Sequence, residues 1–235
     1  MKTGVLTSLL VLLALMLLPS FASAGMEKTR KVGWGPRTSK AAAKLVDRSH
    51  FEPRPENRKS NHRIPGRKLL RAWRKRSDMP YKQYVDGHFR GTTDEIIQWA
   101  AHKWGINTET MRAVATVESW WEMDTRGDEG DSFGIYQVRR PYHCWNSCKI
   151  ARYFTAFNAD YYGGVIRSYY DGTQTWLNTV SGNGKPYRSG DLQGSMGAWF
   201  SGRWWPKDDG VEGYLAAIKQ RRAEKTWFEP FFVGR

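Results

Sequence analysis

The chain has 235 residues, 40% of them hydrophobic, which is enough for one domain with additional segments and excludes a series of several ordinary domains. Its formal net charge is +14, but the excess is uneven: 19 Lys and Arg accompany 6 Asp and Glu between Gly25 and Arg90, whereas the two signs balance from Gly91 to Arg235. A basic charge confined to one segment argues against a nucleic-acid-binding domain as the main function.

The first 24 residues are typical of a secretory signal peptide. Lys2 is followed by an apolar run from Val5 to Leu18, and small residues at 22–24 match a cleavage site. The apolar run is short for a membrane span, although a retained N-terminal anchor is the alternative. We therefore expect an exported protein (periplasmic, cell-wall associated or secreted) whose mature form begins near Gly25.

Residues 25–90 predict a basic linker or pro-segment that is largely disordered. The segment contains five prolines and few apolar residues, so it buries little surface of its own. Residues 69–76 predict a short basic helix on a surface. One interpretation is a solvated linker without a partner. The other is electrostatic contact with an anionic cell-wall polymer or membrane surface.

Residues 91–235 predict a mostly helical domain. Thr92 or Thr93 caps a helix that Gly105 ends, and Asn107 or Thr108 caps the next one. Further helices are expected over 156–171 and 210–227, with turns over 173–194. No long stretch alternates as a strand does.

Glu118 is the most informative single residue of this domain. It recurs on the apolar stripe of the second helix, in step with Met111 and Val114. Burial of a carboxylate raises its pKa, so Glu118 is a candidate general acid near neutral pH. The alternative is a structural carboxylate that reaches solvent or pairs with Arg112 or Arg126.

The domain is also rich in aromatic side chains, whose flat faces and polar edges suit stacking on sugar rings. The alternative is that most of them form the core, as aromatic residues usually do.

Cys144 and Cys148 are the only cysteines in the chain. In an oxidising compartment two thiols this close are expected to form a disulfide. A metal site with His143 is the alternative, but this spacing is not a usual zinc pattern, and we expect no metal.

Several short motifs resemble, in order, those of the family of soluble lytic transglycosylases and goose-type lysozymes. The resemblance extends from about Thr93 to Gly202. The motifs are Glu118–Ser119, the loop 127–130, Gly134–Gln137, Tyr142–His143, Asn158 ahead of Tyr161–Tyr162, and Ala198–Gly202.

This resemblance implies a lysozyme-like α+β fold, predominantly helical, with a groove for peptidoglycan strands. Glu118 would be the general acid, and Ser119 would orient that acid or the substrate. Gln137 and the backbone near Ile135 would hold the N-acetyl group of a sugar.

The same resemblance places three further residues in the groove. Asn158 and Tyr162 would line it, and Trp199 stands where the family usually has a tyrosine. Tyr136 replaces a methionine that contributes to sugar stacking. The family's goose-type members also tend to carry an aspartate soon after the position of Gln137, and none is present here.

The expected reaction is cleavage of the β-1,4 bond between N-acetylmuramic acid and N-acetylglucosamine. With Glu118 as the only clearly placed carboxylate, a lytic transglycosylase that forms 1,6-anhydromuramic ends is favoured, and no cofactor is expected. A hydrolytic lysozyme would need Asp128 or Asp131 as a second carboxylate. A non-catalytic wall-binding module, and a basic protein acting through residues 25–90 alone, are the other classes left open.

Overall fold

The structure, a computed structural model, describes residues 26–145, 148–182, 185–207 and 210–233. The expected signal peptide, 1–24, lies outside the described residues. Within these ranges, no helix is both long and apolar enough to cross a bilayer.

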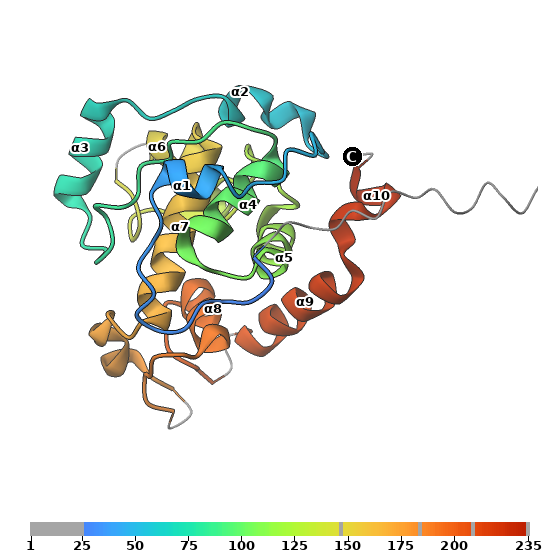
Figure 1. Cartoon of the computed structure of the whole chain (residues 1–235). Helices are drawn as coiled ribbons and strands as arrows, with labels where there is room; N and C mark the ends of the chain where they lie inside the picture. Colours follow the sequence, from blue (N-terminus) through green and yellow to red (C-terminus); the bar gives the residue numbers. More distant parts are fainter. Residues whose placement is uncertain (1–25, 146–147, 183–184, 208–209, 234–235) are drawn as a thin grey trace, which may run out of the picture.

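The fold is predominantly helical with one small sheet, as the sequence predicts (Figure 1). Short 3-10 helices cover Pro55–Asn57, Asp128–Gly130, Thr175–Val180 and Thr226–Phe228. The α-helices are α1 Ser39–Ala43, α2 Arg58–Asn61, α3 Arg67–Arg76, α4 Thr93–Trp104, α5 Thr108–Ser119, α6 Lys149–Arg152, α7 Thr155–Tyr170, α8 Leu192–Ser201, α9 Val211–Glu224 and α10 Pro230–Val233.

The ends of α4 and α5 follow the capping signals of the sequence. The Thr92 hydroxyl accepts from the backbone N–H of Glu95, and the Glu95 carboxylate accepts from the N–H of Thr92, which makes a complete capping box. Gly105 ends α4 in the left-handed conformation, with φ 63°. Asn107 then caps α5 by accepting from the N–H of Thr110 at 2.7 Å. Local sequence therefore determines both boundaries.

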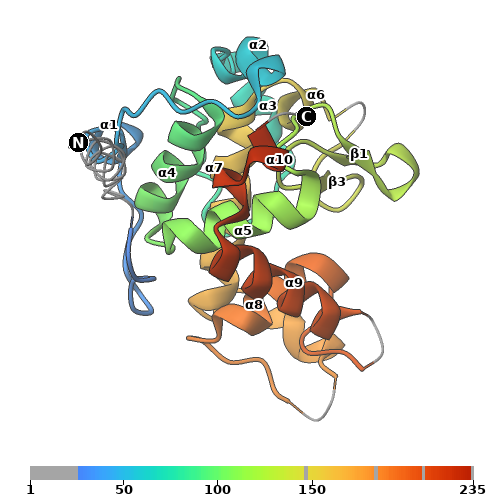
Figure 2. The same ribbon diagram turned by 90° about the vertical axis from the view of Figure 1, so that its right-hand side faces the viewer.

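Helix α7 lies at the centre of the molecule and is buried along nearly its whole length. It packs against α4 on one side and α8 on another, while α5 packs against α9. Gly163 permits the close approach of α4, since a Cβ there would lie 2.4 Å from Cδ1 of Trp104. Figure 2 shows α8 and α9 grouped together below α5.

The sheet has three two-residue strands, β1 Arg126–Gly127, β2 Ser132–Phe133 and β3 Val138–Arg139. They are antiparallel in the order β1-β2-β3, so β1 and β3 are edge strands. Strands of two residues are too short to show the alternation of apolar and polar residues that marks a strand, so the sequence does not predict them.

Residues 26–90 differ from the expectation of a largely disordered segment. They run over the surface of the helical domain, and their scattered apolar residues insert into its core: Trp73 is 4% exposed, and Val85 is fully buried. Asn57 donates to the backbone oxygen of Trp121 at 2.6 Å and to the hydroxyl of Thr93 at 3.0 Å. Composition reflects only what a segment can bury by itself, whereas this one is ordered by the domain that it contacts.

Within that segment, the basic helix expected at 69–76 forms as α3, with Leu70 and Trp73 turned inward. The Trp73 ring meets Phe157 and Tyr161 of α7 edge to face, at 5.1 and 5.7 Å between centroids. The apolar side of α3 is therefore occupied by the core, and its Arg and Lys side chains other than Arg74 are exposed.

Candidate active site

A cavity of about 700 Å³ opens beside the carboxyl end of α5. The small sheet, α7 and α8 contribute most of its walls, and residues 78–79 and the 3-10 helix Thr175–Val180 complete them. Glu118 is the only residue of α5 in the lining. The lining includes Glu118, Gly127, Asp128, Ser132, Gln137, Arg139, Tyr142, His143, Trp176 and Trp199.

Glu118 is held at this position by an abrupt end of its helix. Trp120 and Trp121 both adopt left-handed backbone conformations, with φ 55° and 66°. Such conformations are unfavourable for bulky residues and persist only where the surroundings impose them. Trp121 is fully buried, and its indole N–H donates to the backbone oxygen of Arg112 at 3.0 Å. Burial of this ring stabilises the turn that directs Glu118 into the cavity.

The carboxylate of Glu118 has two side-chain hydrogen-bond donors. The Tyr214 hydroxyl on α9 donates to its Oε1 at 2.5 Å, and Trp199 on α8 also hydrogen-bonds to it. Phe200 stacks on the Tyr214 ring with centroids 4.5 Å apart, which fixes the orientation of the phenol. The α8–α9 pair thus holds an acid that belongs to α5.

Burial raises the pKa of Glu118 from 4.5 to about 7. The hydrogen bond from Tyr214 opposes this increase, because it stabilises the charged form; the negative charge of Asp128 adds to the increase, and the bond from Trp199 lowers it slightly. A carboxyl with this pKa is protonated in a large fraction of molecules at neutral pH, as a general acid requires.

The structural pairings considered for Glu118 do not form. Arg112 binds Asp94 and Glu109, with both nitrogen–oxygen distances 2.7 Å. Arg126 lines a different cavity, on the other face of the sheet. Among the described residues, no cation forms an ion pair with Glu118.

Five of the residues predicted for the groove lie behind its wall rather than in its lining. All five are buried to 5% exposure or less, and the cavity is lined by others: they are Ser119, Ile135, Tyr136, Asn158 and Tyr162. The identity of these residues does not by itself distinguish a side chain that lines the cavity from one that supports its wall.

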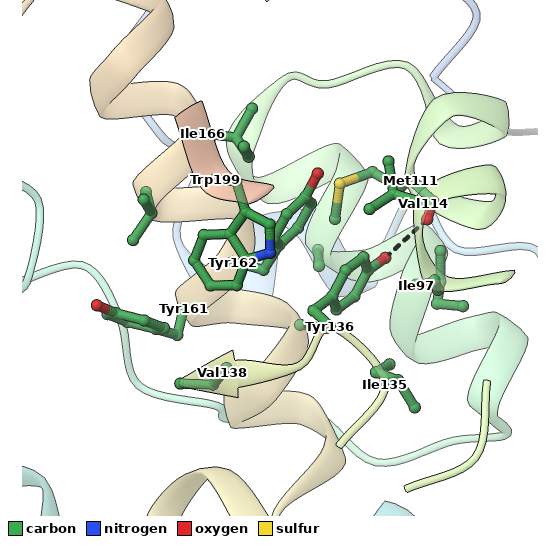
Figure 3. Packing of buried hydrophobic residues seen from close by; sticks show 14 of the residues in the cluster. Ile97, Met111, Val114, Ile135, Tyr136, Val138, Tyr161, Tyr162, Ile166 and Trp199 are labelled. Carbon is green, nitrogen blue, oxygen red and sulfur yellow. Dashed lines mark hydrogen bonds between the residues drawn. The ribbon is translucent and has the colours of Figure 1, made fainter. Parts of the chain in front are cut away.

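These buried residues instead hold the wall in place. Figure 3 shows three of them, Ile135, Tyr136 and Tyr162, in the core. The Ser119 hydroxyl donates to the backbone oxygen of Ile135 at 3.0 Å, which joins the end of α5 to the loop before β3. Asn158 on α7 accepts from the N–H of Tyr136 at 2.9 Å and donates to the backbone oxygen of Phe133 at 2.8 Å. The Tyr136 ring stacks on Tyr162 at 4.1 Å.

Gln137 and Trp199 do line the cavity. Gln137 has φ 48°, and its side-chain oxygen accepts from the N–H of Gly127 at 2.8 Å, which ties β1 to the turn before β3. Trp199 stacks on His143 with centroids 4.6 Å apart. It also meets Tyr162 edge to face at 5.0 Å, and Figure 3 shows these two rings.

The two candidate second carboxylates are placed differently. Asp128 lines the cavity, accepts from the Ser132 hydroxyl and lies 3.5 Å from Nε of Arg139. Asp131 pairs with Arg140 outside the cavity lining. Of these two, only Asp128 lines the cavity that contains Glu118; Asp78 also lines it.

The expected disulfide is confirmed: Cys144 is bonded to Cys148, and their Cα atoms lie 5.4 Å apart. His143 is not a ligand with them; its Nδ1 lies 2.9 Å from the Tyr161 hydroxyl. Burial, together with a smaller contribution from the charge of Arg139, lowers the pKa of His143 to about 4. No group of three or more potential metal ligands occurs in the described ranges.

Sequence reasoning missed Tyr214, although it is the strongest partner of Glu118. It is 96 positions away, and nothing local marks its helix as part of a site. Trp176 and Tyr142 also line the cavity without having been predicted to, and their side chains are 43% and 69% exposed. The exposure of an aromatic ring depends on tertiary structure.

Comparisons with protein families, with curated proteins and with solved structures found no match to this chain. The geometry around Glu118 is therefore the basis for the function proposed below.

Proposed function

We propose that this protein is a lytic transglycosylase that cleaves the β-1,4 bond between N-acetylmuramic acid and N-acetylglucosamine in peptidoglycan. The observation that carries the proposal is the carboxyl of Glu118, whose pKa is raised to about 7 inside a cavity of about 700 Å³. Exposed rings of Trp176 and Tyr142 in the lining offer surfaces for sugars.

In the first step, the protonated Glu118 gives its proton to the glycosidic oxygen as the bond to the muramic C1 breaks. The acetamido group of that sugar stabilises the positive charge that develops at C1. In the second step, Glu118 takes the proton of the muramic 6-hydroxyl while that oxygen bonds to C1, which restores the acid. Between the two steps Glu118 is a carboxylate, and the Tyr214 hydroxyl stabilises this form by donating a hydrogen bond to it.

A hydrolytic lysozyme is the second candidate, and the position of Asp128 favours it. This carboxylate lines the same cavity, and a second carboxylate is what hydrolysis with an activated water requires. However, Asp128 already accepts from Ser132 and lies next to Arg139, so its charge is partly compensated. We therefore rank the hydrolytic lysozyme after the lytic transglycosylase.

We further propose that the protein is exported and contacts an anionic wall polymer or membrane surface through α3. The outer side of this helix carries Arg67, Lys68, Arg71, Lys75 and Arg76, all exposed. Cations gathered on one surface attract polyanions at low ionic strength, and salt screens the attraction.

The decisive experiment compares residues 25–235 with the Glu118→Gln variant on purified peptidoglycan. Glutamine keeps the shape of the side chain but cannot exchange the proton, so we expect activity to fall by at least about a thousandfold. Mass spectrometry of the released fragments gives the outcome: anhydromuramic products indicate a transglycosylase, and products heavier by one water indicate a lysozyme.

Glu212→Gln is the matched control, because Glu212 is exposed on α9 and lies outside the cavity lining. It is expected to retain full activity. Wild-type protein that binds peptidoglycan without releasing fragments would contradict the enzyme proposal and indicate a wall-binding module.

A further inference from the structure

A second cavity, of about 300 Å³, lies across the small sheet from the cavity that contains Glu118. The strand register explains this arrangement. Arg126 is paired with Phe133, and both line the second cavity; Gly127 is paired with Ser132, and both line the first. Because successive residues of a strand point to opposite faces, β1 and β2 form a wall between the two cavities.

The second cavity is placed to receive a branch of a substrate whose main chain lies in the first cavity. Strand β1 is an edge strand, so a branch can pass over it from one face of the sheet to the other. Helices α2 and α6 contribute residues to the lining of the second cavity, and α8 contributes residues to the lining of the first.

The lining of this cavity is cationic. Lys59, Arg63, Arg126 and Arg152 contribute positive charges, against the negative charges of Glu56 and Asp124. Among the residues that the structure describes, Lys59, Arg63 and Arg126 are in no ion pair. Three exposed cations that converge on one hollow attract an anionic group.

Two of the guanidinium groups are held against aromatic rings. The Cζ atom of Arg63 lies 4.9 Å from the Phe154 ring centroid, and that of Arg152 lies 5.2 Å from the Phe133 centroid. A stacked guanidinium keeps its N–H groups at its edge, directed away from the ring, which is the arrangement that binds a carboxylate with two parallel hydrogen bonds.

We propose that the second cavity binds a carboxylate of the short acidic peptides that peptidoglycan strands carry on their muramic residues, while the glycan occupies the first cavity. This inference rests on the proposed function. The two carboxylates in the lining disfavour a dense polyphosphate and offer acceptors for the amide and ammonium groups of a peptide. Tyr153, which is exposed, adds apolar surface for aliphatic side chains.

The test compares two substrates: intact strands, and the same strands after an amidase has removed their peptides. The measured quantity is the ratio of kcat/KM for intact to stripped strands. We expect the wild type to prefer intact strands, and Arg63→Gln combined with Arg126→Gln to reduce that preference about tenfold, since each loses a charge-assisted hydrogen bond. Arg222→Gln, exposed on α9 outside both linings, is the matched control and should keep the preference.

A binding measurement separates this inference from the proposed function. Soluble peptides released by the amidase are titrated by calorimetry into the wild type and into the double variant. We expect weak, saturable binding to the wild type and at least about tenfold weaker binding to the variant. If the wild type cleaves no glycan, the proposed function fails, and this titration alone decides the inference.

Two results would overturn it: equal peptide binding by wild type and double variant, or displacement of the peptide by inorganic phosphate at the same concentration. Thermal unfolding checks that the double variant is folded. Should it fail to fold, Lys59→Gln serves in its place, because Lys59 is exposed at the cavity rim.

Discussion

At the scale of single residues, the surroundings of Glu118 set the pH range in which it can act. Burial raises its pKa to about 7, and Tyr214 opposes that increase by donating to Oε1. A general acid must be protonated at the start of the reaction. The activity of the wild type is therefore expected to be high below pH 7 and to fall as the pH rises through about 7.

Tyr214→Phe tests this balance. Removal of the phenol takes away a donor that favours the charged carboxylate, so the pKa of Glu118 should rise and the basic limb of the pH–rate profile should move to higher pH. The maximal kcat should decrease about tenfold, because the charge-assisted hydrogen bond that supports the carboxylate between the two steps is lost.

The measurement is kcat on peptidoglycan from pH 5 to 9. A merely structural role for Tyr214 would lower kcat without moving the profile, and that result would contradict the assignment. Tyr84→Phe is the matched control, since Tyr84 is exposed and lies outside the cavity lining.

At the scale of elements, a buried ion pair joins α7, which lines the site, to α4. Nζ of Lys103 on α4 lies 2.7 Å from the Asp160 carboxylate on α7 and 3.1 Å from Asp86 in the segment before α4. Asp160 also accepts from the indole N–H of Trp104 at 2.8 Å and from the N–H of Gly87 at 2.9 Å. This cluster links α4, α7 and the N-terminal segment at one point.

Lys103→Met should lower the free energy of unfolding by about 3–5 kcal/mol, because Asp160 would remain buried without its cation. Urea denaturation provides the measurement. The double variant with Asp160→Asn removes both charges and should recover part of the loss. Unchanged stability of the single variant would show that the pair contributes nothing to the helix packing.

At the scale of the whole molecule, residues 26–90 are a structural part of the helical domain. Arg54 is fully buried: its Nε donates to the backbone oxygen of Trp120 at 2.7 Å, and its guanidinium lies 4.1 Å from the Phe232 ring centroid. This residue connects the N-terminal segment, the turn that follows Glu118 and α10. The position of the acid therefore depends on both ends of the described chain.

A chain of residues 91–235 alone should lose cooperative thermal unfolding, because Trp73, Val85 and Phe89 no longer fill the core. Circular dichroism during heating measures this, with residues 26–235 as the control. A shortened chain that unfolds at the same temperature as the control would contradict the structural role and restore the interpretation as a linker.

The sequence by itself determined the features that depend on neighbours a few positions apart. Capping at Thr92 and Asn107 located α4 and α5, the helical period placed Glu118 on an apolar stripe, and the spacing of two cysteines indicated their disulfide. Each of these follows from interactions within a helical turn or a short loop, so it can be predicted without the path of the chain.

Only the tertiary structure decided which distant residues meet. It brought Tyr214 to Glu118 across 96 positions and placed Asn158 behind the cavity wall rather than in it. It also ordered residues 26–90 against the helices and separated two cavities with a sheet of two-residue strands. These features depend on how remote segments pack, and neither composition nor local periodicity contains that information.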